Sequence, residues 1–207
     1  MRHFGPVLLI AAGLLALCGC VSPTIVINPS LPAPALSSSP GPGVDVRLDV
    51  REAAGSRFEE KSDKTLIGKS ESLGVHVSDF WMEEPPARFV QRLIEANLKA
   101  WGHRVVQNGE RVYMRAQVNR VSLDNKAVSA LEFQADGMID VELEVVAKDS
   151  KPGYRRQYLA TCTFRTATSL PNKDNMERTF NQCVDEFQKR ISEDGALRAA
   201  LADIPKQ

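Results

Sequence analysis

Apolar and polar side chains alternate along three successive stretches of the chain, and this alternation limits the possible folds most strongly. Their apolar positions are Val112, Met114, Ala116 and Val118, then Ile139, Val141, Leu143 and Val145, and finally Tyr158, Ala160, Cys162 and Phe164. A period of two predicts β-strands that turn one face towards a core. Residues 44–50 repeat the pattern, and the loss of phase between Val118 and Val121 indicates a bulge.

Two other segments have the helical period instead. The first covers about residues 86–101, begins with proline in its first turn and is followed by Gly102 as its stop. The second covers about residues 172–193 and carries a continuous apolar stripe. We therefore expect an α+β protein with a mainly antiparallel sheet, two amphipathic helices packed on one face of it, and a single domain over residues 44–207.

The first twenty residues have the pattern of a secretory signal. The apolar run at residues 7–17 is too short to span a bilayer, which takes roughly 20 residues. Leu17-Cys18-Gly19-Cys20 resembles the bacterial lipobox, with Cys20 as the residue that receives the lipid. Residues 1–19, including Cys18, are then removed as the signal peptide; the alternative is an ordinary cleaved secretion signal. In the bacterial lipoproteins that this leader resembles, aspartate after the lipidated cysteine retains the protein in the inner membrane. Val21 stands there instead, so the resemblance implies a lipid-anchored protein of the outer membrane that faces the periplasm.

Proline dominates the region that follows, and residues 20–43 are predicted to form the acylated cysteine and a proline-rich tether. Within it, Thr24–Ile27 is a short β-prone island and a candidate for docking on the domain. Two cysteines, Cys162 and Cys183, lie further along the chain in a compartment that permits oxidation. They either form a disulfide between a strand and a helix or are two buried free thiols, and the sequence leaves both alternatives open.

The order of these features resembles the YajG family of uncharacterised bacterial lipoproteins. The likeness rests on the lipobox, "SPTIVINPSLP", "VDVRLDVR", "RFVQRLIEANLKAWGHRVV", the strands that follow and the closing helix, and it covers nearly the whole chain. It implies a periplasmic domain anchored in the outer membrane, with no catalytic residues to carry over. More distantly, the layout is similar to auxiliary lipoproteins of envelope transport and assembly machines, which is an analogy at the level of the fold alone.

The residues themselves favour neither catalysis nor a bound cofactor or metal. Asp140, Glu142 and Glu144 share one face of a predicted strand and could approach a hard cation. Carboxylates at this spacing lie about 6.5–7 Å apart, however, which favours a solvent face paired with arginines of neighbouring strands. We therefore expect no enzyme. The chain has 26 basic and 26 acidic side chains, so its charge balance gives no attraction to nucleic acid.

Binding to a protein partner of the cell envelope is the favoured function. Residues 51–64 are predicted to form a loop or a frayed hairpin, and residues 75–86 a connection that carries Phe80, Trp81 and Met82. Aromatic and methionine side chains are enriched at protein interfaces, so these three are candidate partner-binding residues; the alternative is that they pack beneath the first helix. A binding or assembly factor would dock through this segment or through an exposed sheet edge. The second hypothesis is a carrier of a lipid or cell-wall fragment held between sheet and helices.

Overall fold

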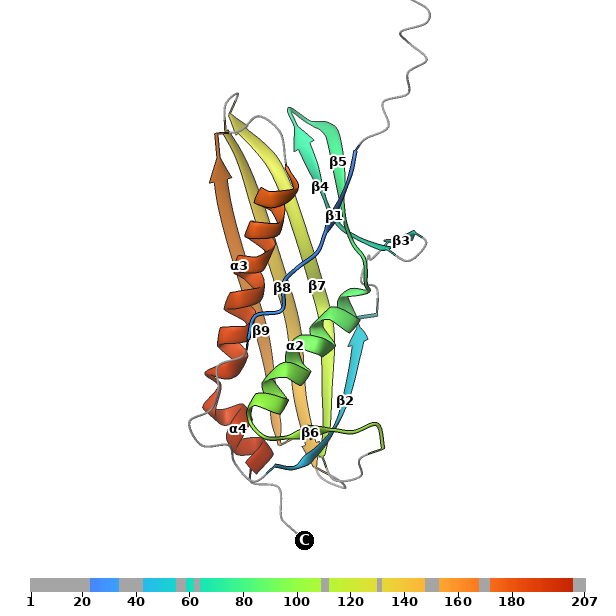
Figure 1. Ribbon diagram of the computed structural model, residues 1–207, viewed down its shortest axis with the longest axis vertical. Helices are drawn as coiled ribbons and strands as arrows, with labels where there is room; N and C mark the ends of the chain where they lie inside the picture. Colours follow the sequence, from blue (N-terminus) through green and yellow to red (C-terminus); the bar gives the residue numbers. More distant parts are fainter. Residues whose placement is uncertain are drawn as a thin grey trace, which may run out of the picture.

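A meander of three long antiparallel strands forms one side of the sheet (Figure 1). β7 (Val112–Ser129) pairs with β8 (Glu132–Ala147), and β8 pairs with β9 (Tyr154–Thr166). These strands contain the three alternating stretches of the sequence, and a register shift between Val118 and Arg120 confirms the predicted bulge. The computed structural model describes residues 23–33, 43–54, 59–61, 64–108, 112–129, 132–147, 153–167 and 172–202.

Two groups of strands share the other edge of β7. The first group pairs with Val112–Val118 and consists of β2 (Asp45–Glu52) and, beside it, β6 (Arg104–Val105). The second pairs with Asn125 and Lys126 and consists of β4 (Lys64–Ser72), β5 (Val75–Met82) and β1 (Thr24–Ile27), with β3 (Glu59–Lys61) joined to β4. Because β7 is long, this one strand can pair with both smaller groups.

The sheet is mixed, which corrects the expectation of a mainly antiparallel one. β1 is parallel to β5, β2 is parallel to β6 and β7, and β4 is parallel to β7. Of the second group, β4 and β5 were not predicted, because their buried positions are partly small and polar. Thr65, Ser70 and Ser78 are buried where a simple alternation would place apolar side chains. Residues 75–82 are consequently a strand and not a connection.

Helices cover one face of the sheet (Figure 1). α2 (Pro86–Ala100) and α3 (Lys173–Ser192) confirm the two predicted helices almost to the residue. The Asn172 side chain caps α3 by accepting a hydrogen bond of 2.8 Å from the Asn175 N–H. The two helices meet at Phe89 and Phe180, whose ring centroids are 6.1 Å apart. A third helix, α4 (Gly195–Ala202), was not predicted; it buries Leu197 and Leu201.

The segment around β1 belongs to the folded domain rather than to a tether. β1 pairs with β5, as the docking prediction for Thr24–Ile27 requires, and Ile27 is fully buried. Just beyond it, the Asn28 N–H donates to Glu177 and the Ser30 N–H to Asn181, both on α3. The tether predicted over residues 20–43 is therefore wrong for this part. Residues 1–22, with the predicted signal peptide and Cys20, and residues 34–42 lie outside the described part of the chain.

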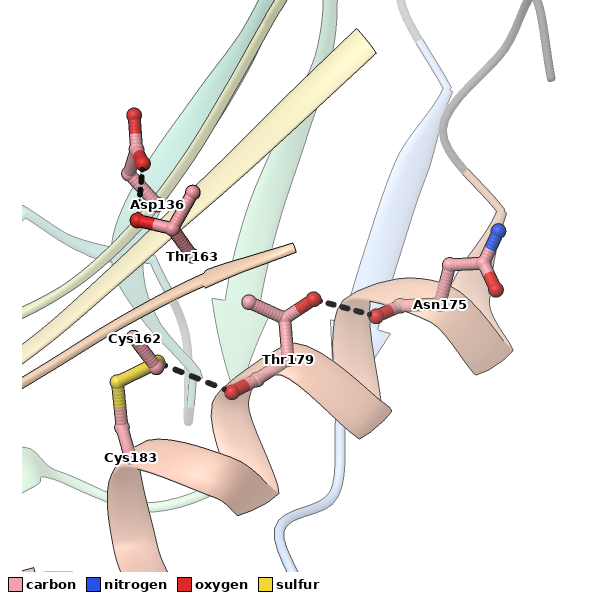
Figure 2. Close-up of a disulfide and its surroundings, with 6 residues drawn as sticks. All are labelled: Asp136, Cys162, Thr163, Asn175, Thr179 and Cys183. Carbon is pink, nitrogen blue, oxygen red and sulfur yellow. Dashed lines mark hydrogen bonds between the residues drawn. A yellow bond between two sulfur atoms is a disulfide. The ribbon is translucent and has the colours of Figure 1, made fainter. Parts of the chain in front are cut away.

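A disulfide joins the edge of the sheet to the helical layer (Figure 2). Cys162 of β9 and Cys183 of α3 are bonded, with their Cα atoms 5.3 Å apart. Gly137 of β8 lies against this bond: a Cβ atom there would be 2.7 Å from Cys162 Sγ and 2.8 Å from Cys183 Sγ. Glycine at this position, within β8, makes room for the disulfide.

Replacing both Cys162 and Cys183 by Ala is expected to lower the free energy of unfolding by about 3 kcal/mol. The bond closes a loop with a sequence separation of 21, and its loss returns conformational freedom to the unfolded chain. Urea denaturation with and without dithiothreitol measures the effect. The reductant should lower the midpoint of the wild-type chain and leave that of the double variant unchanged; equal midpoints for the wild type in both conditions contradict the prediction.

Candidate functional site

The long open edge of the sheet is formed by β9 (Figure 1). Within the described part of the chain, β9 pairs with β8 and with no strand on its other side. The strand has 13 residues, and the side chains of its outer face are exposed. Such an edge presents main-chain donors and acceptors that can pair with a strand of another chain.

The centre of this edge carries no charged side chain. Residues 157–164 read QYLATCTF, without lysine, arginine, acid or proline. Proteins commonly protect long edge strands against pairing by placing charge or proline on them. Here the arginines stand towards the ends, at positions 155, 156 and 165, and Leu159 is 41% exposed in between. The middle of β9 is therefore open to strand addition.

The acidic row predicted on β8 lies on the outer face of the sheet, and each of its members has a partner on a neighbouring strand. The distances are 2.8 Å from Gln157 Nε2 to Asp140 Oδ1, 2.8 Å from Arg155 Nε to Glu142 Oε1, and 3.7 Å from Arg115 Nη1 to Glu144 Oε2. On the same face, the Thr163 hydroxyl donates to Asp136, shown in Figure 2. The described residues contain no cluster of three or more possible metal ligands among His, Cys, Asp and Glu.

Three side chains of β9 converge on the carboxylate of Asp194, between α3 and α4. Asp194 Oδ2 accepts hydrogen bonds at 2.7 Å from Tyr154 Oη, at 2.8 Å from Tyr158 Oη and at 2.6 Å from Arg156 Nη1. Its Oδ1 accepts one at 2.9 Å from the Leu197 N–H and so caps α4. We call Tyr154, Arg156, Tyr158 and Asp194 the Asp194 cluster. It ties the beginning of β9 to the junction of the last two helices.

The pKa values within the Asp194 cluster favour a structural role. Burial acts to raise the pKa of Asp194, but hydrogen bonds from the Leu197 backbone, Tyr154, Tyr158 and Arg156 outweigh it and lower the pKa to about 2. Burial raises the pKa of Tyr154 to about 12, and burial with the neighbouring Tyr154 and Asp194 raises that of Tyr158. A general acid or base works best with a pKa near the operating pH. These groups are shifted away from it, and their protonation states are fixed.

The structure corrects the prediction that Phe80, Trp81 and Met82 bind a partner. All three lie in β5 and are 0%, 7% and 0% exposed. β5 is an interior strand, because β1 pairs with it on one side and β4 on the other. These side chains are core residues, which is the alternative that the sequence left open.

The Asp194 cluster was missed by sequence reasoning, although one signal for it exists. Asp194 precedes a segment with Leu197 and Leu201 at helical spacing, which is the pattern of an N-cap before a short amphipathic helix. That Tyr154, Arg156 and Tyr158 approach it follows from the packing of β9 under α3 and α4, which no local pattern encodes.

The described residues form a single mixed α/β domain in which β9 is an edge strand and the Asp194 cluster joins that strand to the last two helices. Residues 81–202 match the model of the Lipoprotein_16 family, described as uncharacterized lipoprotein. The match covers more than half of the chain, which therefore belongs to this family of lipoproteins. No curated protein matches the sequence.

Solved structures that are similar to this chain have low sequence identity to it. Protein XCC0632 from Xanthomonas campestris has a TM-score of 0.52 and 12% identity over 86% of this chain and 96% of that chain. A minor lipoprotein from Acinetobacter baumannii has a TM-score of 0.41 and 9% identity, over 76% of this chain and 92% of that chain. The first likeness shows the fold. Of the helices described, none is both long and apolar enough to cross a bilayer.

Replacing Asp194 by Asn is expected to lower the free energy of unfolding at pH 7 by about 2 kcal/mol. The folded-state pKa of about 2 lies below the ordinary value of 3.8, so ionised Asp194 stabilises the fold above that value and less as the pH falls through 3.8 towards 2. Asparagine also caps helices well, so the variant isolates the charge. Denaturation curves at several pH values should show the difference between wild type and variant shrinking towards pH 2; a difference independent of pH contradicts the prediction.

Proposed function

We propose that the protein is a lipid-anchored, non-catalytic accessory factor of the cell envelope that binds a partner protein by strand addition at β9. One observation carries this proposal: β9 is a 13-residue edge strand with an uncharged centre. Main-chain hydrogen bonds to an added strand would supply affinity, and the exposed side chains around Leu159 would supply specificity.

The ties that hold β9 support this role. The strand is paired with β8 on its inner side, bonded to α3 through Cys162, and held near its beginning by Asp194. Binding costs free energy when it must order a mobile segment, and a strand that is already fixed avoids much of that cost. The disulfide and the Asp194 cluster thus both restrain β9, at two different places along the strand.

Membership of a lipoprotein family and the leader sequence support anchoring through Cys20. Several acyl chains, at about 0.8 kcal/mol for each buried methylene, would hold the mature protein firmly on a membrane. Val21 and the resemblance to the YajG family support the periplasmic side of the outer membrane as its location.

The alternative function, binding of a small ligand such as a lipid or cell-wall fragment, has less support. The space between the sheet and the helices is occupied by fully buried side chains, among them Phe89, Phe180 and Phe187. A surface hollow over β2, β7 and β8 is open and lined mainly by charged residues such as Asp49, Arg51 and Glu144. An apolar ligand fits neither place.

A photocrosslinking residue at position 161, in the centre of β9, is expected to capture one dominant envelope protein in cells. The same probe at Gln182, an exposed position of α3, is the matched control. Leu159→Lys should abolish capture from position 161, because it places a charge on the edge while leaving the core intact. The same spread of adducts from both probe positions would argue against strand addition at β9.

Cys20→Ala is expected to abolish incorporation of a labelled fatty acid and to release the protein from membranes. Cys18→Ala is the control and should leave both properties unchanged, because Cys18 belongs to the removed signal peptide in this scheme. Metabolic labelling followed by mass spectrometry of the mature N-terminus measures the outcome. Labelling that survives Cys20→Ala would overturn the proposed anchor.

A further inference from the structure

The turn between β4 and β5 exposes an apolar side chain in an unfavourable backbone conformation. Ser72 pairs with Val75, so Leu73 and Gly74 form a two-residue turn, and both have positive φ values of 50° and 77°. Asparagine, aspartate or glycine normally occupies the first position of such a turn. Leu73 is instead 90% exposed, so it adds backbone strain and leaves an apolar side chain in water.

Two further exposed apolar residues lie at the same end of the sheet. Val75 follows the turn and is 65% exposed, and Val128, near the end of β7, is 42% exposed. β4 and β7 are parallel, with Glu71 opposite Lys126, so Leu73 and Val128 lie at nearly the same level. Figure 1 shows that the ends of both hairpins reach the same end of the molecule. We call Leu73, Val75 and Val128 the apolar tip.

Cys20, the proposed lipid-bearing residue, comes only three positions before Pro23, at which the described chain enters the domain. The Pro23 carbonyl accepts a hydrogen bond of 3.3 Å from the Asp79 N–H, and β1 then runs parallel to β5. Asp79 is four residues from Val75, or about 13 Å along the strand. Cys20 is three residues before Pro23 and can lie at most about 10 Å from it. The lipid is thereby confined to the end of the domain that carries the apolar tip.

Charged groups around the tip are paired with one another. The pairs are Lys69 with Glu71 at 2.6 Å, His76 with Asp79 at 3.2 Å, and Lys126 with Asp136 at 3.0 Å. Among the residues that the structure describes, these pairs leave no excess of positive charge around the tip for anionic headgroups. Any contact with a membrane at this place depends on apolar surface and should respond little to salt.

We propose that the apolar tip inserts into the lipid leaflet that holds the acylated Cys20, and so sets the orientation of the domain on the membrane. This inference rests on the proposed anchor. Leu73 and Val75 enter the region of the headgroups and upper acyl chains, where exposed apolar side chains are stabilised. The strands β4, β5, β7 and β9 then extend away from the membrane surface. The domain is held on the membrane by two contacts, the lipid on Cys20 and the apolar tip, instead of by the lipid alone.

An environment-sensitive nitrobenzoxadiazole label at position 75 tests the proposal in the acylated mature chain. A Val75→Cys substitution supplies the reactive thiol, since Cys162 and Cys183 are bonded to each other and the sulfur of Cys20 carries lipid. The chain is reconstituted in phosphatidylethanolamine–phosphatidylglycerol vesicles with and without headgroup-spin-labelled lipid. We expect several-fold stronger quenching at position 75 than at a matched label introduced by Leu159→Cys, which is exposed on β9, away from the tip.

A second variant separates membrane contact from folding. Leu73→Asn places the preferred residue in the turn, so the melting temperature should stay the same or rise while lipid quenching at position 75 falls. Equal quenching at positions 75 and 159 in an acylated chain that floats with vesicles overturns insertion of the tip and leaves the anchor intact. A chain that lacks the acyl group, as measured by mass spectrometry, overturns the anchor and this inference together.

Discussion

The pairing of β7 with β8 is the interaction on which the other elements depend. β7 is 18 residues long, and its two halves offer separate edges to β2 and to β4. β8 pairs with both halves of β7, so that two strand groups that do not pair with each other become one sheet. The helical layer can then bury a single continuous face, on which α2 and α3 meet at Phe89 and Phe180. Without β7, the first group would consist only of β2 and β6, which are too few strands for a stable sheet.

Periodicity in the sequence predicted those elements whose buried positions are apolar. The three alternating stretches became β7, β8 and β9, and the two helical segments became α2 and α3 within about one residue of their predicted ends. β4 and β5 were not predicted, because Thr65, Ser70 and Ser78 fill buried positions. At these buried positions the neighbouring strands lie close together, so only small side chains fit between them. Gly68 shows the same constraint, since a Cβ atom would lie 1.8 Å from the carbonyl oxygen of Leu123.

The candidate site could be predicted only in part, for a different reason. Sequence reasoning named an exposed sheet edge as a possible docking surface, and it left the pairing of Cys162 with Cys183 open. It could not identify β9 as the edge, because strand order depends on contacts between distant parts of the chain. Phe80–Met82 illustrates the opposite error: an aromatic cluster looks like a recognition surface until β1, more than 50 positions earlier in the chain, is placed beside it. The composition of a segment says what it can bind, whereas its neighbours decide whether anything reaches it.

The two proposed contacts fit one geometry. β9 is antiparallel to β8, so Thr166 lies beside Phe133 at the end of the apolar tip, and Tyr154 lies at the far end beside Val145. With the tip in the leaflet, the edge strand extends about 40 Å away from the membrane surface. A partner strand added there would run along the same direction, and the disulfide and the Asp194 cluster would both resist a pull on it. The lipid anchor alone would allow the domain to lie at any angle; a second contact at Leu73 and Val75 would keep the β9 edge upright and accessible to a partner in the periplasm.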